Sequence, residues 1–198
     1  MNTDRPYTPA DSGYPAWLAK LGRPPHILGN TTLLKTPPIA IVGSRRCPGA
    51  LLLAAAEWAE AWVIRGGARP PLAGGFQTPV EAEVLRRLLR GGSPALVLPA
   101  RSLPRRLSPA QREALEAGRL LFASPFTAHR PTVALAASRN ALLARMARAV
   151  IVLHAAPRSR TLAWCAKACA EGLPLYTFEH AANAPVFGLG ARPLSEMT

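Results

Sequence analysis

The 198-residue chain is long enough to bury one good hydrophobic core, and its length favours a single domain. Its 24 basic side chains outnumber the 11 acidic ones and give a net charge of +13, which favours an anionic partner such as nucleic acid or a nucleotide. Asp4 and Asp11 are the only aspartates, so chemistry that needs Asp as a metal ligand, triad member or paired acid is largely excluded.

The N-terminal part of the chain differs in composition from the rest. Residues 1–13 are polar and proline-rich, lack a signal-peptide core and are expected to form a flexible leader. A short helix is expected to begin at Tyr14 and to stop at Arg23, and residues 26–30 suit a short strand and turn. No apolar segment is long enough to cross a membrane. Three cysteines without a secretion signal predict reduced thiols and a cytoplasmic protein.

From residue 39 onward, apolar runs alternate with helical patterns. The expected strands are 39–42, 71–73, 95–98, 120–123, 150–153 and 175–178, and the expected helices are 49–65, 79–90, one starting at Pro109, 135–148 and 161–172. This alternation predicts an α/β fold, a Rossmann-like, doubly wound and mainly parallel sheet with helices on both faces. We expect one such domain over residues 14–180, followed by a loosely docked C-terminal tail over residues 181–198.

The segment IAIVGSRRCPG, residues 39–49, is the most informative stretch. Four apolar residues suit a buried strand, Gly43 suits a tight turn, and a helix is expected to follow. Backbone N–H groups in such a turn, together with the positive end of the helix dipole, favour an anion. Arg45 and Arg46 add guanidinium groups, whose planar shape suits phosphate. The segment therefore predicts a phosphate-binding turn.

Two common nucleotide motifs are missing. A dinucleotide fingerprint needs glycines at GxGxxG spacing and an acid after the second strand, whereas the first loop reads GSRRCPG and the second strand ends in AGGFQ. The GxxxxGK[ST] signature of a P-loop is absent as well. We therefore expect no NAD or FAD, and no cofactor or metal of any kind.

Four blocks in the expected order resemble the DprA (Smf) family of DNA-processing proteins. They are Tyr14-Pro15 with Leu18 followed by RPPHILG, the strand and turn IAIVGSRR, the turn LAGG at 72–75, and Ser138-Arg139-Asn140 before a helix and the strand AVIVLHA. The resemblance spans about residues 14–178. At its second turn the family usually reads SGxAxGID…AH, whereas this chain reads AGGFQTPVEAEV and keeps Glu81 as the nearby acid.

The resemblance implies a Rossmann-like domain that binds single-stranded DNA in a basic pocket, forms a homodimer and delivers DNA to the recombinase RecA. By position it assigns the pocket to Gly43, Ser44, Arg45, Arg46, Gly74, Gly75, Gln77, Arg139 and Asn140. It leaves DNA uptake and recombination, or a mobile element or defence locus, as the biological setting.

The loops at the same edge of the expected sheet add further candidates. Arg158, Ser159 and Thr161 follow the strand at 150–153 and are candidates for binding a phosphate. Arg158 and Arg160 favour static contact with an anion over hydrolysis. Arg130 lies in a loop that should reach this edge, either against a phosphate or in solvent. Phe76 and Phe126 are placed to stack on a base. Trp58 and Trp62 lie one helical turn apart and are expected in the core or a dimer interface.

Alternative functions are weighed against this hypothesis. The Lonely Guy-type nucleotide phosphoribohydrolases of the wider group carry PGGxGTxxE, but Trp164 stands here where their glutamate would act, so no catalytic residue is expected. A sensor domain that binds a nucleotide-derived small molecule remains the main alternative, and a degenerate scaffold that only dimerises is a third. Cys165, Cys169 and His154 are too few for a structural zinc site. Arginine-rich composition alone is the alternative explanation of the charge.

Overall fold

The computed structural model describes residues 5–15, 18, 23–67 and 69–197, and the strands in this part of the chain form one sheet. The order across the sheet is β1-β5-β4-β3-β2-β6-β7-β8. β1 runs antiparallel to β5, and the other neighbouring pairs are parallel. The strands are β1 (His26–Gly29), β2 (Ile39–Gly43), β3 (Leu72–Gly74), β4 (Ala95–Val97), β5 (Leu120–Ser124), β6 (Ala149–His154), β7 (Leu175–Thr177) and β8 (Arg192–Pro193).

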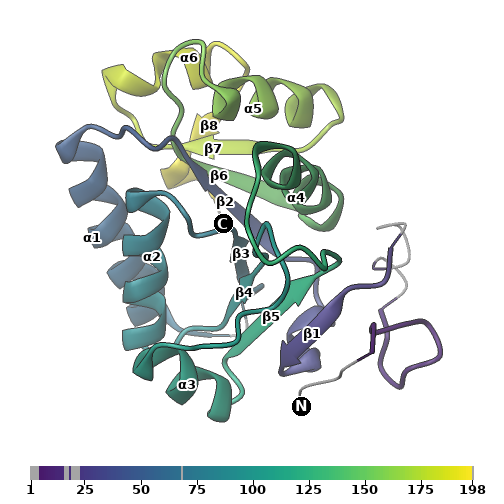
Figure 1. Ribbon diagram of the computed structural model, residues 1–198. Helices are drawn as coiled ribbons and strands as arrows, with labels where there is room; N and C mark the ends of the chain where they lie inside the picture. Colours follow the sequence, from purple (N-terminus) through teal and green to yellow (C-terminus); the bar gives the residue numbers. More distant parts are fainter. Residues whose placement is uncertain (1–4, 16–17, 19–22, 68, 198) are drawn as a thin grey trace.

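Helices cover both faces of this sheet (Figure 1). The helices α1, α2 and α3 pack on one face, and α4, α5 and α6 on the other, each set over its own cluster of buried apolar side chains. Their bounds are α1 (Gly49–Arg65), α2 (Pro79–Arg90), α3 (Pro109–Glu116), α4 (Val133–Met146), α5 (Arg160–Ala170) and α6 (Ala184–Phe187). The predicted α/β, Rossmann-like, doubly wound sheet is therefore confirmed.

The two central strands show why the apolar runs fold as they do. Every residue of β2 and β6 is buried, because helices cover both faces of the sheet at this point. The chain reaches β5 by moving outward from β2 in one direction and then returns to place β6 on the other side of β2. The strand order thus reverses between β2 and β6, and ligands of open α/β sheets bind at the carboxyl ends of the strands at such a point.

Helix starts follow the sequence closely. Thr78 caps α2, with its side chain accepting from the Glu81 N–H, and Pro79 occupies the first turn. Ser108 caps α3 through a reciprocal capping box whose partner is Gln111. These caps fix where α2 and α3 leave the carboxyl edge of the sheet.

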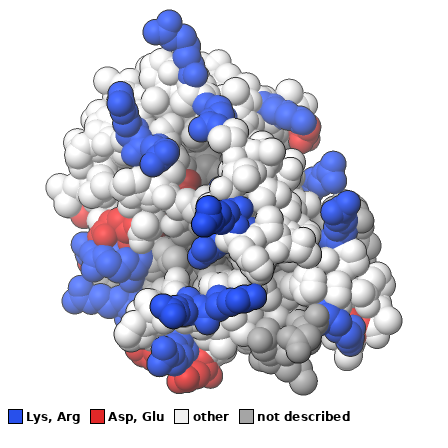
Figure 2. Space-filling model, viewed as in Figure 1, with Lys and Arg blue, Asp and Glu red and all other residues white. Residues whose placement is uncertain are grey.

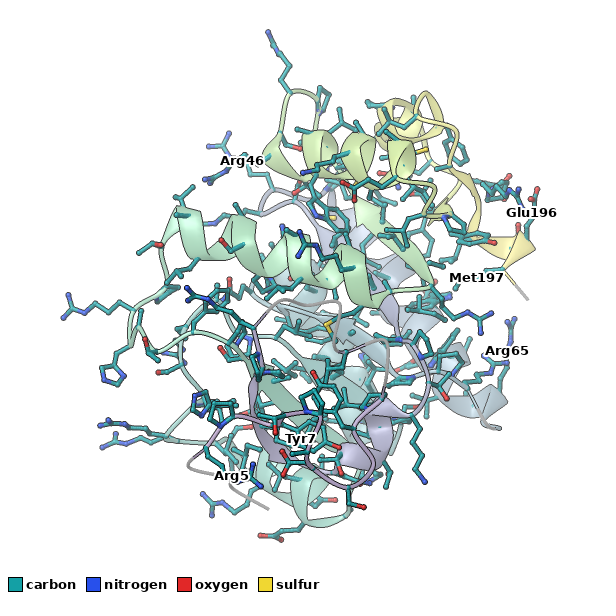
Figure 3. The ribbon with its side chains drawn as sticks, turned by 90° about the vertical axis from the view of Figure 1, so that its right-hand side faces the viewer. Arg5, Tyr7, Arg46, Arg65, Glu196 and Met197 are labelled. Atoms are coloured by element: carbon teal, nitrogen blue, oxygen red, sulfur yellow. The ribbon has the colours of Figure 1, made fainter. Side chains whose placement is uncertain are left out.

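Parts of the predicted leader and of the predicted tail pack against the rest of the protein. Tyr7, in the predicted flexible leader, is only 5% exposed, its N–H donates to the Pro25 carbonyl, and its ring packs against Tyr14 (Figure 3). In the predicted loose tail, Asn183 and Val186 are fully buried and β8 extends the sheet. Burial of single apolar or amide side chains holds both segments in place. Such isolated contacts leave no periodic pattern in the sequence, so they could not be predicted from it. The helix expected at Tyr14 falls largely on residues 16–17 and 19–22, outside the described residues.

Membrane insertion by a helix is not a feature of the described residues. None of the helices there combines the length and the apolar character that crossing a membrane requires.

Candidate functional site

Loops after β2, β3 and β5 meet at the carboxyl edge of the sheet. With α4 and α5 they line a cavity of about 810 Å³, the switch-point cavity. Figure 2 shows Lys and Arg side chains gathered around a hollow on the face drawn in Figure 1. The cavity brings together seven of the predicted site residues: Gly43, Arg45, Gly75, Gln77, Arg139, Asn140 and Thr161. Arg46 lines an adjoining cavity of about 520 Å³ with Arg45 and His154.

Glu81 occupies the floor of the switch-point cavity. Its carboxylate is 5% exposed and accepts hydrogen bonds from the Gly43 N–H at 2.8 Å and the Gln77 N–H at 3.0 Å. These are backbone amides of the two glycine turns that the sequence assigns to a phosphate. In the structure the anion bound there is a side chain of the protein itself. The sequence reveals Glu81 as a nearby acid but not this role, because its bond to Gly43 spans 38 residues.

Arg139 lies beside this carboxylate and is also buried, with 7% of its surface exposed. Its guanidinium donates to the Leu98 carbonyl at 3.2 Å and to Asn140 Oδ1 at 2.7 Å. Gly75 makes room for it, since a Cβ on Gly75 would lie 1.2 Å from Arg139 Nη1. Glu81, Arg139 and Gly75 together form the floor. Through its bond to the Leu98 carbonyl, Arg139 ties α4 to the end of β4.

The electrostatics of the floor follow from burial. Desolvation raises the pKa of the Glu81 carboxyl above its ordinary value and lowers the pKa of the Arg139 guanidinium. The attraction between the two charges, and the amide hydrogen bonds to Glu81, oppose these shifts. Removing either partner would therefore leave the other as a buried charge with too little compensation.

Two predicted hydroxyl residues join the loops that follow β2 and β6. The Ser44 N–H donates to the His154 carbonyl at 2.8 Å, and its hydroxyl accepts from the Ala156 N–H at 3.1 Å. Ser159 lies 3.4 Å from the Ser44 hydroxyl and caps α5 by accepting from the Leu162 N–H at 3.1 Å. Both hydroxyls have partners within the protein, so they fix the shape of the site.

Four arginines in the loops after β2 and β6, here called the rim, contrast with the floor: Arg45, Arg46, Arg158 and Arg160. Arg45 and Arg160 line the switch-point cavity, Arg46 lines the adjoining one, and Arg158 precedes Arg160 in the chain. All four side chains are exposed, and none forms an ion pair with any residue that the structure describes. Arg158 also has a φ of 56°, a left-handed backbone that is costly for a residue other than glycine and that clusters at functional sites. Exposed guanidinium groups without internal partners are available to phosphates.

Some predicted residues have other surroundings. Phe76, expected to stack on a base, is 8% exposed and packs in the core under α2, with its ring against Gly74, so burial leaves no ring face for a base. Phe126 is half-buried and Arg130 is exposed in the loop before α4, outside the cavity lining.

Arg160, which the sequence predicts to contact an anion, faces the same cavity as Arg45. The structure also places Trp164 in this lining, a residue that the sequence-based site lacks. Trp164 joins α5 to α4 by donating from Nε1 to the Asn140 carbonyl at 2.9 Å. The position of Trp164 depends on how α4 and α5 pack, and no local motif encodes that.

The thiols and His154 serve packing. Burial raises the pKa of the Cys165 thiol to about 12, and the Cys169 thiol donates to the Leu189 carbonyl. His154 Nδ1 lies 3.0 Å from Asn183 Oδ1 in a buried polar network. Across the described residues, no three His, Cys, Asp or Glu side chains are grouped in a way that could hold a metal ion.

The reversed strand order and the basic cavity beside it define a class of protein: Rossmann-like, with a site suited to an anion. The family model for DNA recombination-mediator protein A matches residues 5–192, so this chain belongs to the DprA family. The resemblance seen in the four sequence blocks is thereby confirmed.

Solved structures share this fold. DprA from Streptococcus pneumoniae matches with a TM-score of 0.77 and 20% identity over 96% of this chain and 70% of that one. DprA from Helicobacter pylori, whose structure describes a single-stranded DNA binding mode, matches with a TM-score of 0.72 and 20% identity over 98% of this chain and 93% of that one. The molybdenum cofactor carrier protein from Chlamydomonas reinhardtii matches with a TM-score of 0.53 and 16% identity over 78% of this chain and 84% of that one. No curated protein matches the chain by sequence.

Proposed function

We propose that this chain binds single-stranded DNA at the rim of the switch-point cavity, without catalysis. The observation that carries the proposal is the set of four exposed arginines in the loops at the switch point, which lack ion pairs with any described residue. Arg45 and Arg160 line the switch-point cavity, and Arg46 lines the cavity beside it. When such guanidinium groups neutralise phosphates of a nucleic acid, the counterions condensed on that backbone are released, which favours binding. Membership of the DprA family and the likeness to a DprA described as binding single-stranded DNA support it.

The proposal places the phosphates on side chains of the rim and not on backbone amides of the turns. The Gly43 and Gln77 amides already donate to Glu81, so the strand would contact Arg45 and Arg160, with Gln77 and Thr161 on the same wall. Glu81 accepts from the Gly43 and Gln77 amides, is attracted by the charge of Arg139, and does no proton transfer in this proposal. Cytoplasmic location, a homodimer, and delivery of the strand to a recombinase during DNA uptake or recombination complete the proposed role.

A nucleotide-sized ligand is the second candidate. Its support is the size of the switch-point cavity, about 810 Å³, which lies within the range of about 300–1,000 Å³ typical of small-molecule sites. The two candidates differ in how affinity depends on ligand length, because a strand binder gains contacts with each added nucleotide and a small-molecule sensor does not.

Fluorescence anisotropy of labelled oligonucleotides, titrated across salt, separates them. We expect tighter binding to single strands than to duplexes, affinity that rises with length, and weak competition by a mononucleotide. Arg45→Ala should weaken binding about fivefold and reduce the slope of log affinity against log salt by about 0.7, the value for one phosphate of a single strand. Arg90→Ala, which removes one exposed charge from the end of α2, serves as the matched control. Equal effects of the two variants, or saturation by a mononucleotide, would contradict the strand-binding proposal.

A further inference from the structure

A second cavity, of about 860 Å³, opens at the opposite edge of the sheet, where the strands begin. Its wall includes Ile39 and Ala149, the first residues of β2 and β6, together with side chains from the end of α1. We call it the aromatic groove. Figure 3 shows the two edges on opposite sides, with Arg46 on one and Arg65 and Met197 on the other. The groove is therefore separate from the switch-point cavity.

Aromatic rings dominate the groove. Trp58 and Trp62 lie with ring centroids 5.4 Å apart, and Phe178 meets Trp58 edge-on at 6.5 Å. The Arg69 guanidinium stacks over Trp62 at 4.7 Å from its centroid. Both tryptophans are half-buried and pack against the apolar cluster on this face of the sheet. Rings and stacked guanidinium planes with a free face are the surfaces on which nucleobases stack.

The rim of the groove is basic. Arg65 and Arg148 are exposed, and neither has an ion pair with any described residue, while Glu179 is the acidic member of the lining. A second copy of this chain is a poor occupant, because an isologous contact would bring two copies of this basic rim together in a protein of net charge +13. A ligand that carries planar rings and negative charge complements both features.

We propose that the aromatic groove is a second nucleic-acid site, which stacks bases of a single strand near Arg69 and Trp62 and holds their phosphates with Arg65 and Arg148. The proposal rests on the proposed function, because its ligand is a further segment of the same strand. A strand that engages both edges of the sheet gains affinity through effective concentration, so long oligonucleotides would bind far more tightly than short ones.

Tryptophan fluorescence distinguishes the two sites, because each contains its own reporter. In a Trp17→Phe, Trp164→Phe protein only the groove tryptophans emit. In a Trp17→Phe, Trp58→Phe, Trp62→Phe protein only Trp164 emits, and it reports on the switch-point cavity. The probe is oligothymidine of about 4 nucleotides, the short end of known site sizes. We expect it to quench the groove tryptophans, and to do so equally after Arg45→Ala and Arg160→Ala are added. Arg65→Ala with Arg148→Ala should weaken this quenching about fivefold, and Arg90→Ala should leave it unchanged.

Each other outcome overturns one claim. Quenching of Trp164 without quenching of the groove tryptophans would refute the groove and leave the proposed function standing, whereas loss of both signals would refute the proposed function. Sedimentation velocity tests whether a second copy of the chain occupies the groove. A dimer that dissociates on Arg148→Glu would assign the groove to that second copy and overturn the proposal. Because the arginine variants lie at the surface, they test the groove even if a tryptophan variant fails to fold.

Discussion

The floor and the rim of the switch-point cavity are both built on arginine, but they differ in whether the protein itself satisfies the charge. On the floor, Arg139 is buried beside Glu81 and donates to the Leu98 carbonyl and to Asn140. At the rim, Arg45 and its neighbours are exposed and have no ion pair with a described residue. We therefore expect substitutions on the floor to change the stability of the fold, and substitutions at the rim to change the affinity for an anion.

The largest expected effect is on the floor. Arg139→Ala leaves the buried Glu81 carboxylate without its counter-charge, and we expect a loss of about 3–5 kcal/mol in the free energy of unfolding. Urea denaturation followed by circular dichroism measures it. Arg145→Ala, on the same helix but exposed and without an ion pair among the described residues, should stay within about 0.5 kcal/mol of wild type. Similar losses in both variants would break the distinction between floor and rim.

Gly75→Ala should cause the next largest loss of stability. A Cβ there would lie 1.2 Å from Arg139 Nη1, and the guanidinium cannot move aside without giving up its bond to the Leu98 carbonyl. We expect a loss of about 2–4 kcal/mol, measured as a lower Tm by differential scanning calorimetry. Gly49→Ala is the control, because no heavy atom lies within 4 Å of a Cβ at that position. A neutral Gly75→Ala would mean that Arg139 is not held where we place it.

Glu81→Gln should cost about 1–3 kcal/mol, because an amide cannot accept from both the Gly43 and Gln77 N–H groups. It also carries a pH signature. Burial raises the pKa of Glu81 above its ordinary value of 4.5, so the folded protein keeps this proton to a higher pH than the unfolded chain. Wild type should therefore lose stability, relative to the variant, as pH rises through that pKa. Unfolding titrations from about pH 4 to 8 test this, and a gap that widens with pH would contradict it.

The smallest expected effect on stability is that of Ser159→Ala, which also tests whether Ser159 contacts DNA. Ser159→Ala removes the cap of α5 and should cost about 1 kcal/mol of stability. Because its hydroxyl already has partners within the protein, we expect single-stranded DNA affinity to stay within about twofold of wild type. A much larger loss of affinity, measured by anisotropy, would mean that Ser159 contacts the DNA and does not only stabilise the fold.

The sequence predicts the frame of this molecule well, because local patterns determine it. The apolar runs of β2 and β6 and the capped start of α2 follow from residue type and spacing alone. The position of the site follows too, since the carboxyl ends of parallel strands meet at one edge.

What the sequence cannot supply is the partner of each charged group. Nothing local distinguishes Arg139, which folds inward, from Arg45, which stays in solvent. The bonds that decide the floor and the loops join residues far apart, such as Ser44 and Ser159, separated by 115 positions. The docking of Asn183 is of the same kind, because its amide reaches Thr177 and the Leu153 carbonyl only once the sheet has formed.

The most direct test of the central claim is the salt dependence of single-stranded DNA affinity in the Arg45→Ala, Arg160→Ala double variant. With two rim contacts removed, the slope of log affinity against log salt should fall by about 1.4, twice the value for one phosphate, while the Tm stays at the wild-type value. An unchanged slope in a folded double variant would show that the strand, if it binds, does not bind at the rim.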